Sequence, residues 1–434
     1  MTLRAGKSIL PYFINIMNDI YFKGNVASQL GFTPEHKLCS SAKTTSSPEA
    51  SIDWKIEAMS DYLPQEVITN ILLRLPIKSL VICTSVCKSW GSMITNSSFI
   101  QAHLSHRINF NNLHGTHLLL LHGVSCENYG NNFFHHAHIH NLKKEVYSLH
   151  YDSHVFDEYC KIGFQSPVAD RKMSNECFRV VGICNGLVFL ADDLSRLGYN
   201  FMIWNPSIRK SVILPKPGLR YETFGGYNAC HGFAFDAITK DYKVVRIVEE
   251  EPGDQTFVEV YSLAAGSWSD SRLVDPQCGI NIGSPQAFVN GALHWDAHRF
   301  RSSSYRYFIL AFDVSSELFR EMMLPKSLDP NLASFLSLQL SVSGDGKSLA
   351  MFVRDSTRSS FLDIWVMKEY SVQESWTKLY SIYPQDPADS LLRPLCFRKS
   401  DIIITPWILT MRALSYLTEM MRSFAEQKKR LVQQ

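Results

Sequence analysis

The sequence lacks a long apolar run, a Cys-x-x-Cys pair and a marked excess of charge of either sign. No stretch approaches the roughly eighteen apolar residues of a membrane-spanning helix, so no membrane partner is expected. The ten cysteines are scattered, which argues against zinc ribbons and secreted disulfide frameworks and favours a reducing compartment, cytoplasmic and/or nuclear. With 43 Lys and Arg against 41 Asp and Glu, the molecule has no strong positive electrostatic potential overall that would attract nucleic acid.

Sequence signatures of catalysis are also missing. No Gly-x-Ser-x-Gly elbow is present, so the sequence gives no nucleophile motif for a hydrolase and no catalytic residue is assigned. The segment 344–348 reads Gly-Asp-Gly-Lys-Ser, but a phosphate loop needs glycine where Ser341 stands and a helix after the lysine. We therefore expect a hairpin turn at Asp345 and Gly346, and no nucleotide or other cofactor.

One histidine cluster could hold a metal. His136, His138 and His140 alternate along the chain, so on a strand they would share one face. No acidic or cysteine ligand lies nearby, and a single edge strand rarely supplies a closed site. A polar, solvent-facing strand is the better interpretation, and no metal is expected.

With 434 residues, 45% of them hydrophobic and 19% charged, the chain is long enough for more than one domain with a sizeable core. The N-terminal part differs from the rest. Arg4 and Lys7 precede a short apolar stretch that faintly resembles a targeting peptide, but Pro11 and Asn15 interrupt it. Residues 1–58 are therefore predicted to be a disordered extension.

From Met59 the apolar residues follow a helical pattern. After Leu63 and Pro64 they fall at 67, 68, 71, 72 and 75, and Pro76 ends this segment. Two further short apolar segments predict three short helices within residues 59–104. So small a module buries its own apolar surface poorly, so part of that surface is either an interface or packs on the rest of the chain.

The order and spacing of residues 63–99 resemble an F-box, specifically the plant form. The resemblance implies that this module binds the Skp1 adaptor of cullin-based ubiquitin ligases through an apolar helical surface. The residues that it assigns to Skp1 binding are Leu63, Pro64, Ile68, Ile71, Leu75, Pro76, Leu80, Val86, Cys87 and Trp90.

After about residue 115 the pattern changes to short strands separated by turn residues. An aromatic strand followed by a turn recurs at Trp204, Tyr261, Phe312 and Trp365, with spacings of 57, 51 and 53 residues. A period near 50 built from strand pairs is typical of propeller blades. The tryptophans of this region, such as Trp268, Trp295 and Trp376, are expected to pack within or between blades.

Phrases in the same region, among them residues 203–207, 258–262 and 290–295, resemble the plant F-box-associated domain, including kelch-like and S-locus F-box-like relatives. The resemblance covers residues 110–400. Beyond Ser400 it stops, and apolar residues at 414, 417, 421 and 424 predict a helix. Residues 401–434 are therefore expected to form a divergent helical tail, which would leave the last blade incomplete.

Together these features predict an α+β chain, with a small N-terminal helical F-box followed by a large all-β propeller-like domain. The resemblance implies a non-catalytic substrate-recognition subunit of an SCF-type ubiquitin ligase. Its partners would be a Skp1-like adaptor, through it cullin and E2, and a target protein held by the β domain. Two alternatives stay open: a propeller-type enzyme acting on carbohydrates or small molecules, and a Skp1 scaffold without ubiquitin transfer.

Overall fold

The computed structural model describes the chain in two compact units, residues 1–118 and 119–434, which are treated separately below. The described residues are 63–114, 118–126, 142–151, 158–164, 178–192, 200–219, 227–250, 255–274, 277–280, 286–301, 304–328, 336–343, 346–355, 362–382, 392–397 and 402–406. The N-terminal extension, the histidine cluster and the part of the predicted helical tail after residue 406 lie outside these residues.

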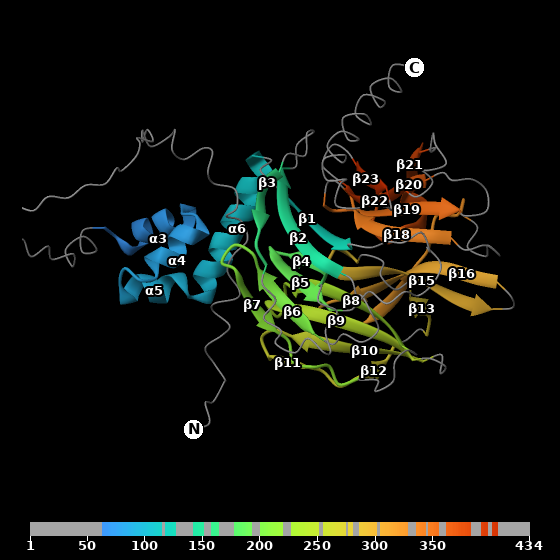
Figure 1. The fold of residues 1–434 in the computed structure, drawn as a ribbon, viewed down its shortest axis with the longest axis horizontal. Helices are drawn as coiled ribbons and strands as arrows, with labels where there is room; N and C mark the ends of the chain where they lie inside the picture. The colour runs from blue at the N-terminus through green and yellow to red at the C-terminus, as the bar shows by residue number, and fades with distance from the viewer. Residues whose placement is uncertain are drawn as a thin grey trace, which may run out of the picture. The chain divides into compact units, whose positions relative to one another are not determined.

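The first unit is helical (Figure 1). It contains α3 (Gln65–Arg74), α4 (Ile77–Cys83), α5 (Lys88–Ile94) and α6 (Ser97–His114). Pro64 and Pro76 directly precede α3 and α4, where the missing N–H of proline costs no hydrogen bond. The buried apolar side chains of the four helices are Ile68, Leu72, Ile77, Leu80, Ile94, Phe99, Ile100 and Leu104.

Helix α6 corrects the expectation of three helices within 59–104. It runs to His114, past the expected end of the helical module and past residue 110, where the β domain was expected to begin. Its sequence is rich in polar residues, so the helical pattern is weak. Tertiary packing of Phe99, Ile100 and Leu104 supplies the core contacts that the pattern did not reveal.

The second unit consists of antiparallel sheets. A small sheet contains β1 (Leu118–Cys126), β2 (Leu142–Tyr151) and β3 (Glu158–Ile162). The first blade contains β4 (Arg179–Cys184), β5 (Leu187–Ala191), β6 (Phe201–Asn205) and β7 (Lys210–Ile213). The second contains β8 (Tyr227–Asp236), β9 (Asp241–Glu250), β10 (Gln255–Ser262), β11 (Ser267–Trp268) and β12 (Arg272–Leu273).

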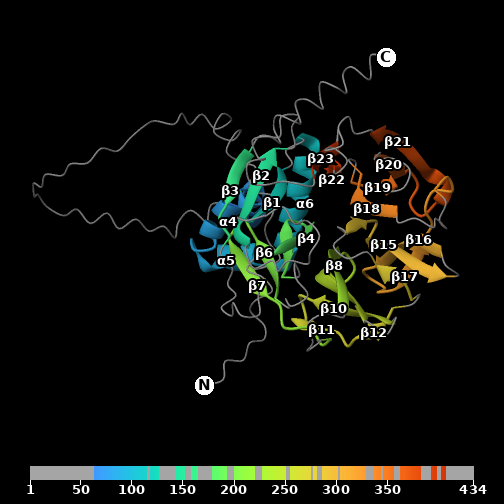
Figure 2. The same ribbon diagram turned by 45° about the vertical axis from the view of Figure 1, so that its right-hand side comes forward.

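The third blade contains β13 (Gly279–Ile280), β14 (Ala287–Val289), β15 (Ala292–Arg301), β16 (Ser304–Asp313) and β17 (Phe319–Met322). The fourth contains β18 (Leu336–Val342), β19 (Leu349–Asp355), β20 (Leu362–Met367) and β21 (Trp376–Ile382). Figure 2 shows these four blades following one another in sequence order, as in a four-bladed β-propeller. The predicted fold class is therefore confirmed.

The sequence repeat coincides with the blades. Trp204, Tyr261, Phe312 and Trp365 lie on β6, β10, β16 and β20, which occupy the same position in the order of their sheets. The expected hairpin at Gly346 is also present, since β18 and β19 pair with Val342 opposite Leu349. One repeat of the sequence is thus one blade.

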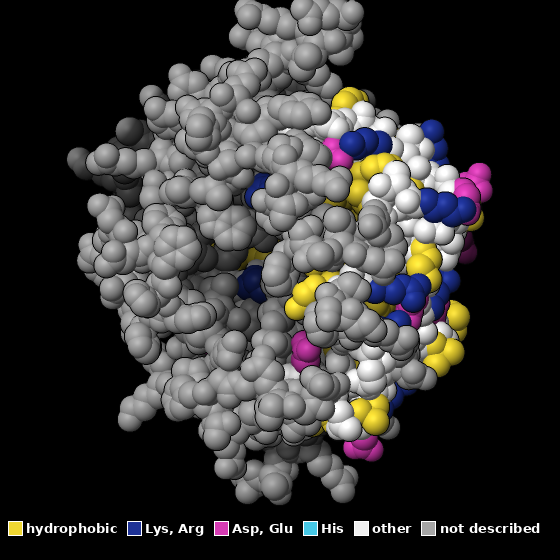
Figure 3. Space-filling model, turned by 90° about the vertical axis from the view of Figure 1, so that its right-hand side faces the viewer, with side chains coloured by type: hydrophobic (Ala, Val, Ile, Leu, Met, Phe, Trp, Pro, Cys, Tyr) yellow, Lys and Arg dark blue, Asp and Glu magenta, His cyan; other side chains and the backbone are white. Residues whose placement is uncertain are grey.

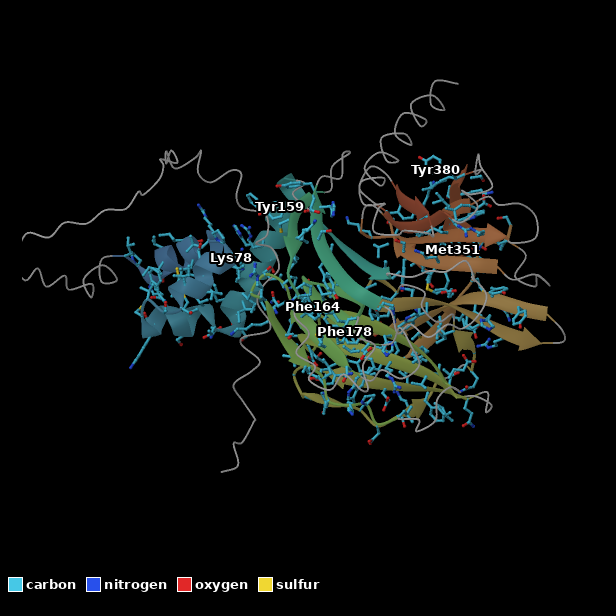
Figure 4. The ribbon with its side chains drawn as sticks, in the orientation of Figure 1. Lys78, Tyr159, Phe164, Phe178, Met351 and Tyr380 are labelled. Atoms are coloured by element: carbon cyan, nitrogen blue, oxygen red, sulfur yellow. The ribbon has the colours of Figure 1, made fainter. Side chains whose placement is uncertain are left out.

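Tryptophans join neighbouring blades through their indole N–H groups. Trp268 of β11 donates to the carbonyl of Pro215 at 2.7 Å, just after β7, and Trp376 of β21 donates to that of Met323 at 3.1 Å, just after β17. Phe164 and Phe178, labelled in Figure 4, pack with Tyr147 and Trp204 where the small sheet meets the first blade. These aromatic residues serve blade packing.

The C-terminal boundary at residue 400 is wrong. Strand β23 (Ile402–Pro406) pairs antiparallel with β22 (Leu392–Phe397), and Phe397 stacks on Phe352 of the fourth blade at 5.1 Å. The β-branched run at 402–405 favours a strand over the expected continuation into a helix. Among the described residues, only these two strands follow β21.

A glycine at a blade junction gives a test of this packing. A Cβ at Gly232 of β8 would lie 2.7 Å from Trp295 Cζ2, 2.8 Å from Leu293 Cδ1 and 2.8 Å from Gln286 Oε1. Overpacking of this kind costs about 1–3 kcal/mol. We expect Gly232→Ala to lower the urea midpoint of β-domain unfolding accordingly. Gly163→Ala is the matched control, because nothing lies within 4 Å of its Cβ position; equal midpoints for the two variants would contradict the packing described.

Candidate functional site

The helical unit leaves two groups of large apolar side chains exposed. Along α3 and its entry, Leu63, Val67 and Ile71 recur every four residues and are 44%, 41% and 49% exposed; they are called the α3 stripe. Val81, Ile82 and Val86, at the end of α4 and in the following turn, are called the α4 group. These six side chains, on or beside α3 and α4, are candidates for an interface.

The α3 stripe is not needed for the core of the helical unit. On the same helix Ile68 and Leu72 are buried, with exposures of 6% and 0%, and they supply the core contacts. Helix α3 is therefore apolar on two sides. One side packs within the unit, and the side chains of the other are exposed to solvent.

The ten residues assigned by the resemblance fall into three classes. Leu63, Pro64, Ile71, Val86 and Cys87 are exposed, and Leu75, Pro76 and Trp90 are half-buried. Ile68 and Leu80 are buried and belong to the core. The assignment omitted the exposed Val67, Val81 and Ile82, although the four-residue spacing from Leu63 to Ile71 was a signal for Val67.

Cys87 lies directly before α5 and has a polar neighbourhood. Its Sγ is 3.3 Å from the Ser89 hydroxyl, and hydrogen bonds from Ser89 and from the Trp90 backbone lower the pKa of the thiol below its usual value. The side chain is exposed, so it is accessible to a partner of the α4 group.

A buried histidine connects α6 to the end of α3. His103 is 3.1 Å from the Leu75 carbonyl through Nε2, which must donate because a carbonyl only accepts. Burial lowers the pKa of His103 to about 4, and the nearby positive charges of Arg107 and His106 act in the same direction. At neutral pH the ring is therefore uncharged, and it stacks on Phe99.

The pKa of His103 predicts that acid destabilises the helical unit. Because the folded pKa is below the ordinary value of 6.5, the contribution to stability is complete above about pH 6.5 and is lost as the pH falls toward 4. We expect the helical circular dichroism signal to melt at a lower temperature at pH 5 than at pH 7.5. The pH-dependent drop should shrink in His103→Gln and persist in His106→Gln; an unchanged drop in His103→Gln would refute this origin.

In the described part of the β domain, no group of three or more His, Cys, Asp or Glu side chains is placed to hold a metal ion. Burial raises the pKa of Cys184 and Cys278 to about 12, so these thiols stay protonated and are poor nucleophiles. The described residues contain no helix that is long and apolar enough to cross a membrane.

A helical module with exposed apolar side chains, followed by a β-propeller, defines the class of protein to which this chain belongs. Comparison with family models gives the same division, since an F-box domain matches residues 61–101 and an F-box associated beta propeller domain matches residues 138–405. The chain therefore belongs to the F-box proteins that carry an F-box associated beta propeller domain.

Three relatives from Arabidopsis thaliana are similar over about three quarters of this chain. The F-box protein At3g07870 is 28% identical, with 78% of this chain and 77% of the relative covered. The F-box protein CPR1 is 27% identical over 78% of this chain and 77% of its own length. The F-box/kelch-repeat protein At3g23880 is 27% identical over 74% and 79%. The resemblance to plant F-box proteins is confirmed.

Proposed function

We propose that this chain is the substrate-recognition subunit of an SCF-type ubiquitin ligase. Its helical unit binds a Skp1-like adaptor and through it cullin and E2, and its β domain holds a target protein without catalysing a reaction itself. The observation that supports this function best is the pair of exposed apolar groups, the α3 stripe and the α4 group, on a module of the F-box family.

The size of the exposed apolar surface suits a protein interface. Fully burying a Val, Leu or Ile side chain contributes about 1.5–3 kcal/mol, and each of the six side chains is already partly covered. We therefore assign each roughly 1–1.5 kcal/mol on docking. Association itself costs several kcal/mol, so removing even two of the six side chains is expected to lower the affinity for the adaptor strongly.

The β domain is suited to present a surface. Hydrogen bonds from Trp268 and Trp376 join each of two blades to the segment that leaves the preceding blade. Interactions of this kind reduce relative motion of the blades, and a preorganised surface loses less entropy on binding. We place the protein in the cytoplasm and/or nucleus, a proposal that rests on the scattered spacing of the cysteines in the sequence.

The proposal is tested by reconstitution with a purified Skp1-like adaptor, cullin, its RING partner, E1 and E2. We expect the full chain to co-purify with the adaptor and the cullin and to support ubiquitin transfer to a bound protein. Co-purification with the adaptor but not with cullin would favour the scaffold alternative. Failure to bind any Skp1-like adaptor from the same plant source would refute the proposed function.

A further inference from the structure

Hydrogen bonds and ion pairs connect two tight turns of neighbouring blades. One, residues 237–240, joins β8 to β9, and the other, residues 314–318, joins β16 to β17. The Ser315 hydroxyl donates to Asp236 Oδ1 at 2.7 Å, and Lys243 Nζ donates to the Val314 carbonyl at 2.9 Å. Lys243 also pairs with Asp236 at 3.1 Å and with Glu317 at 3.0 Å.

Each turn is also held internally. Asp236 Oδ1 accepts from the Ile238 backbone N–H at 2.9 Å, and Asp313 Oδ1 accepts from that of Ser316 at 2.7 Å. Burial opposes ionisation of Asp236, but hydrogen bonds from Ser315, Thr239, Ile238 and Lys243 outweigh it and lower the pKa of the carboxyl group. The two turns therefore form one rigid, charged network at the junction of the second and third blades.

This network holds two apolar side chains in solvent. Ile238 is 78% exposed and Leu318 is 64% exposed, more than any other large apolar side chain in the described part of the β domain. Neither contributes to the core, and a small polar residue would satisfy both turns equally well. Because the two turns are held together by hydrogen bonds, these side chains offer a preorganised apolar contact to a partner.

One exposed charge, that of Lys240, lies two residues after Ile238. Lys240 ends the first turn with φ of 58°, a left-handed conformation that favours glycine or asparagine. Its side chain is exposed and forms no hydrogen bond or ion pair within the described residues. The acids of the two turns are already engaged, because Asp236, Asp241 and Asp313 accept hydrogen bonds. Glu317 pairs with Lys243 and Arg272.

We propose that Ile238, Lys240 and Leu318, here called the turn patch, form a docking site for an acidic segment of the target protein that carries a large apolar side chain. This inference rests on the proposed role as a substrate receptor. The apolar side chain of the target would contact Ile238 and Leu318, while a carboxylate one to three residues away would pair with Lys240.

The dimensions of the turn patch favour a short segment over a second copy of this chain. A stable dimer normally buries more than about 1,000 Å² in total, and two side chains supply only a small part of that area. On the face shown in Figure 3, apolar side chains likewise form small groups separated by charged ones. A peptide segment needs only a few such contacts when the surface is already rigid.

The test is a selection from a randomised 12-residue peptide library displayed on phage, with the full chain as bait. We expect enrichment of peptides in which a large apolar residue lies within three positions of Asp or Glu. Selected peptides are then synthesised and titrated by fluorescence anisotropy. Ile238→Ser with Leu318→Ser should weaken binding at least tenfold, and Lys240→Glu about fivefold.

Matched controls separate the turn patch from surface effects in general. Leu273→Ser removes an exposed apolar side chain of β12, and Lys216→Glu reverses an exposed charge outside the two turns; both should leave peptide affinity unchanged. Selection of no acidic and apolar peptides, or undiminished binding by the Ile238 and Leu318 double variant, would overturn the proposal. Because the assay contains no adaptor or cullin, its result is independent of whether the ligase assembles.

Discussion

Replacing Ile71 and Val86 by alanine is expected to weaken binding of the Skp1-like adaptor about a hundredfold. Ile71 belongs to the α3 stripe and Val86 to the α4 group, and they are 49% and 54% exposed. Truncating an apolar anchor at the centre of an interface costs about 1–2 kcal/mol or more, so the pair should cost about 3 kcal/mol. That free energy corresponds to roughly two powers of ten in Kd.

The affinity can be measured by isothermal titration calorimetry with purified adaptor, and the fold of each variant by its thermal melt. Because both side chains are largely exposed, the melting temperature should not change. Leu379→Ala, at an exposed apolar position on the outer strand β21, is the control and should bind the adaptor like the parent chain. Full affinity in the double variant would show that Ile71 and Val86 do not contact the adaptor.

Buried members of the assigned set should behave differently. Ile68 and Leu80 are 6% and 1% exposed, so alanine at either position leaves a cavity that costs about 2–5 kcal/mol. Adaptor binding would then be lost because the helical unit unfolds. A loss of affinity is therefore informative about contact only for the exposed positions.

Sequence reasoning found the helical module but could not divide its residues between core and interface. Periodicity places Val67, Ile68, Ile71 and Leu72 on the broad apolar side of α3. It does not say that Ile68 and Leu72 face the other helices while Val67 and Ile71 face solvent. That division depends on α6, whose weak pattern hid both the helix and its contacts with α3.

In the β domain the sequence repeat predicted the blades, but the sequence did not predict the contacts between one blade and the next. Trp204, Tyr261, Phe312 and Trp365 mark the blades because each lies on the corresponding strand. The bonds that join blades, such as that of Trp268 to Pro215, link residues 53 positions apart. No local pattern of polarity identifies such partners, and the same holds for the two turns that support the turn patch.

One buried ion pair illustrates this limit and gives the second large effect. Arg246 of β9 and Glu259 of β10 have side chains 1% and 0% exposed, with 2.6 Å between Nη1 and Oε2. Both also bond the segment after the first blade: Arg246 donates to the Leu219 carbonyl at 3.1 Å, and Glu259 Oε1 accepts from the Leu219 N–H at 2.8 Å. Charged residues on strands suggest solvent exposure, yet the pair lies in the interior.

Glu259→Ala is expected to destabilise the β domain by about 3–5 kcal/mol, because it leaves the Arg246 guanidinium buried without its counter-ion and the Leu219 N–H without its acceptor. Urea unfolding followed by tryptophan fluorescence would measure this as a lower midpoint. The control is Lys326→Ala, since Lys326 pairs with Glu374 at 2.6 Å but both side chains are more than half exposed. Exposed pairs contribute about 0–1 kcal/mol, so this variant should unfold almost like the parent chain.

A double variant separates the cost of an unpaired charge from the value of the pair itself. Buried ion pairs can often be replaced by apolar side chains of similar volume with little loss of stability. Arg246→Met with Glu259→Leu should therefore recover part of the stability lost in Glu259→Ala, although the Leu219 N–H and carbonyl would still lack partners. If the double variant is less stable than Glu259→Ala, the pair contributes net stability. Its role would then be to fasten the segment at Leu219 to the second blade.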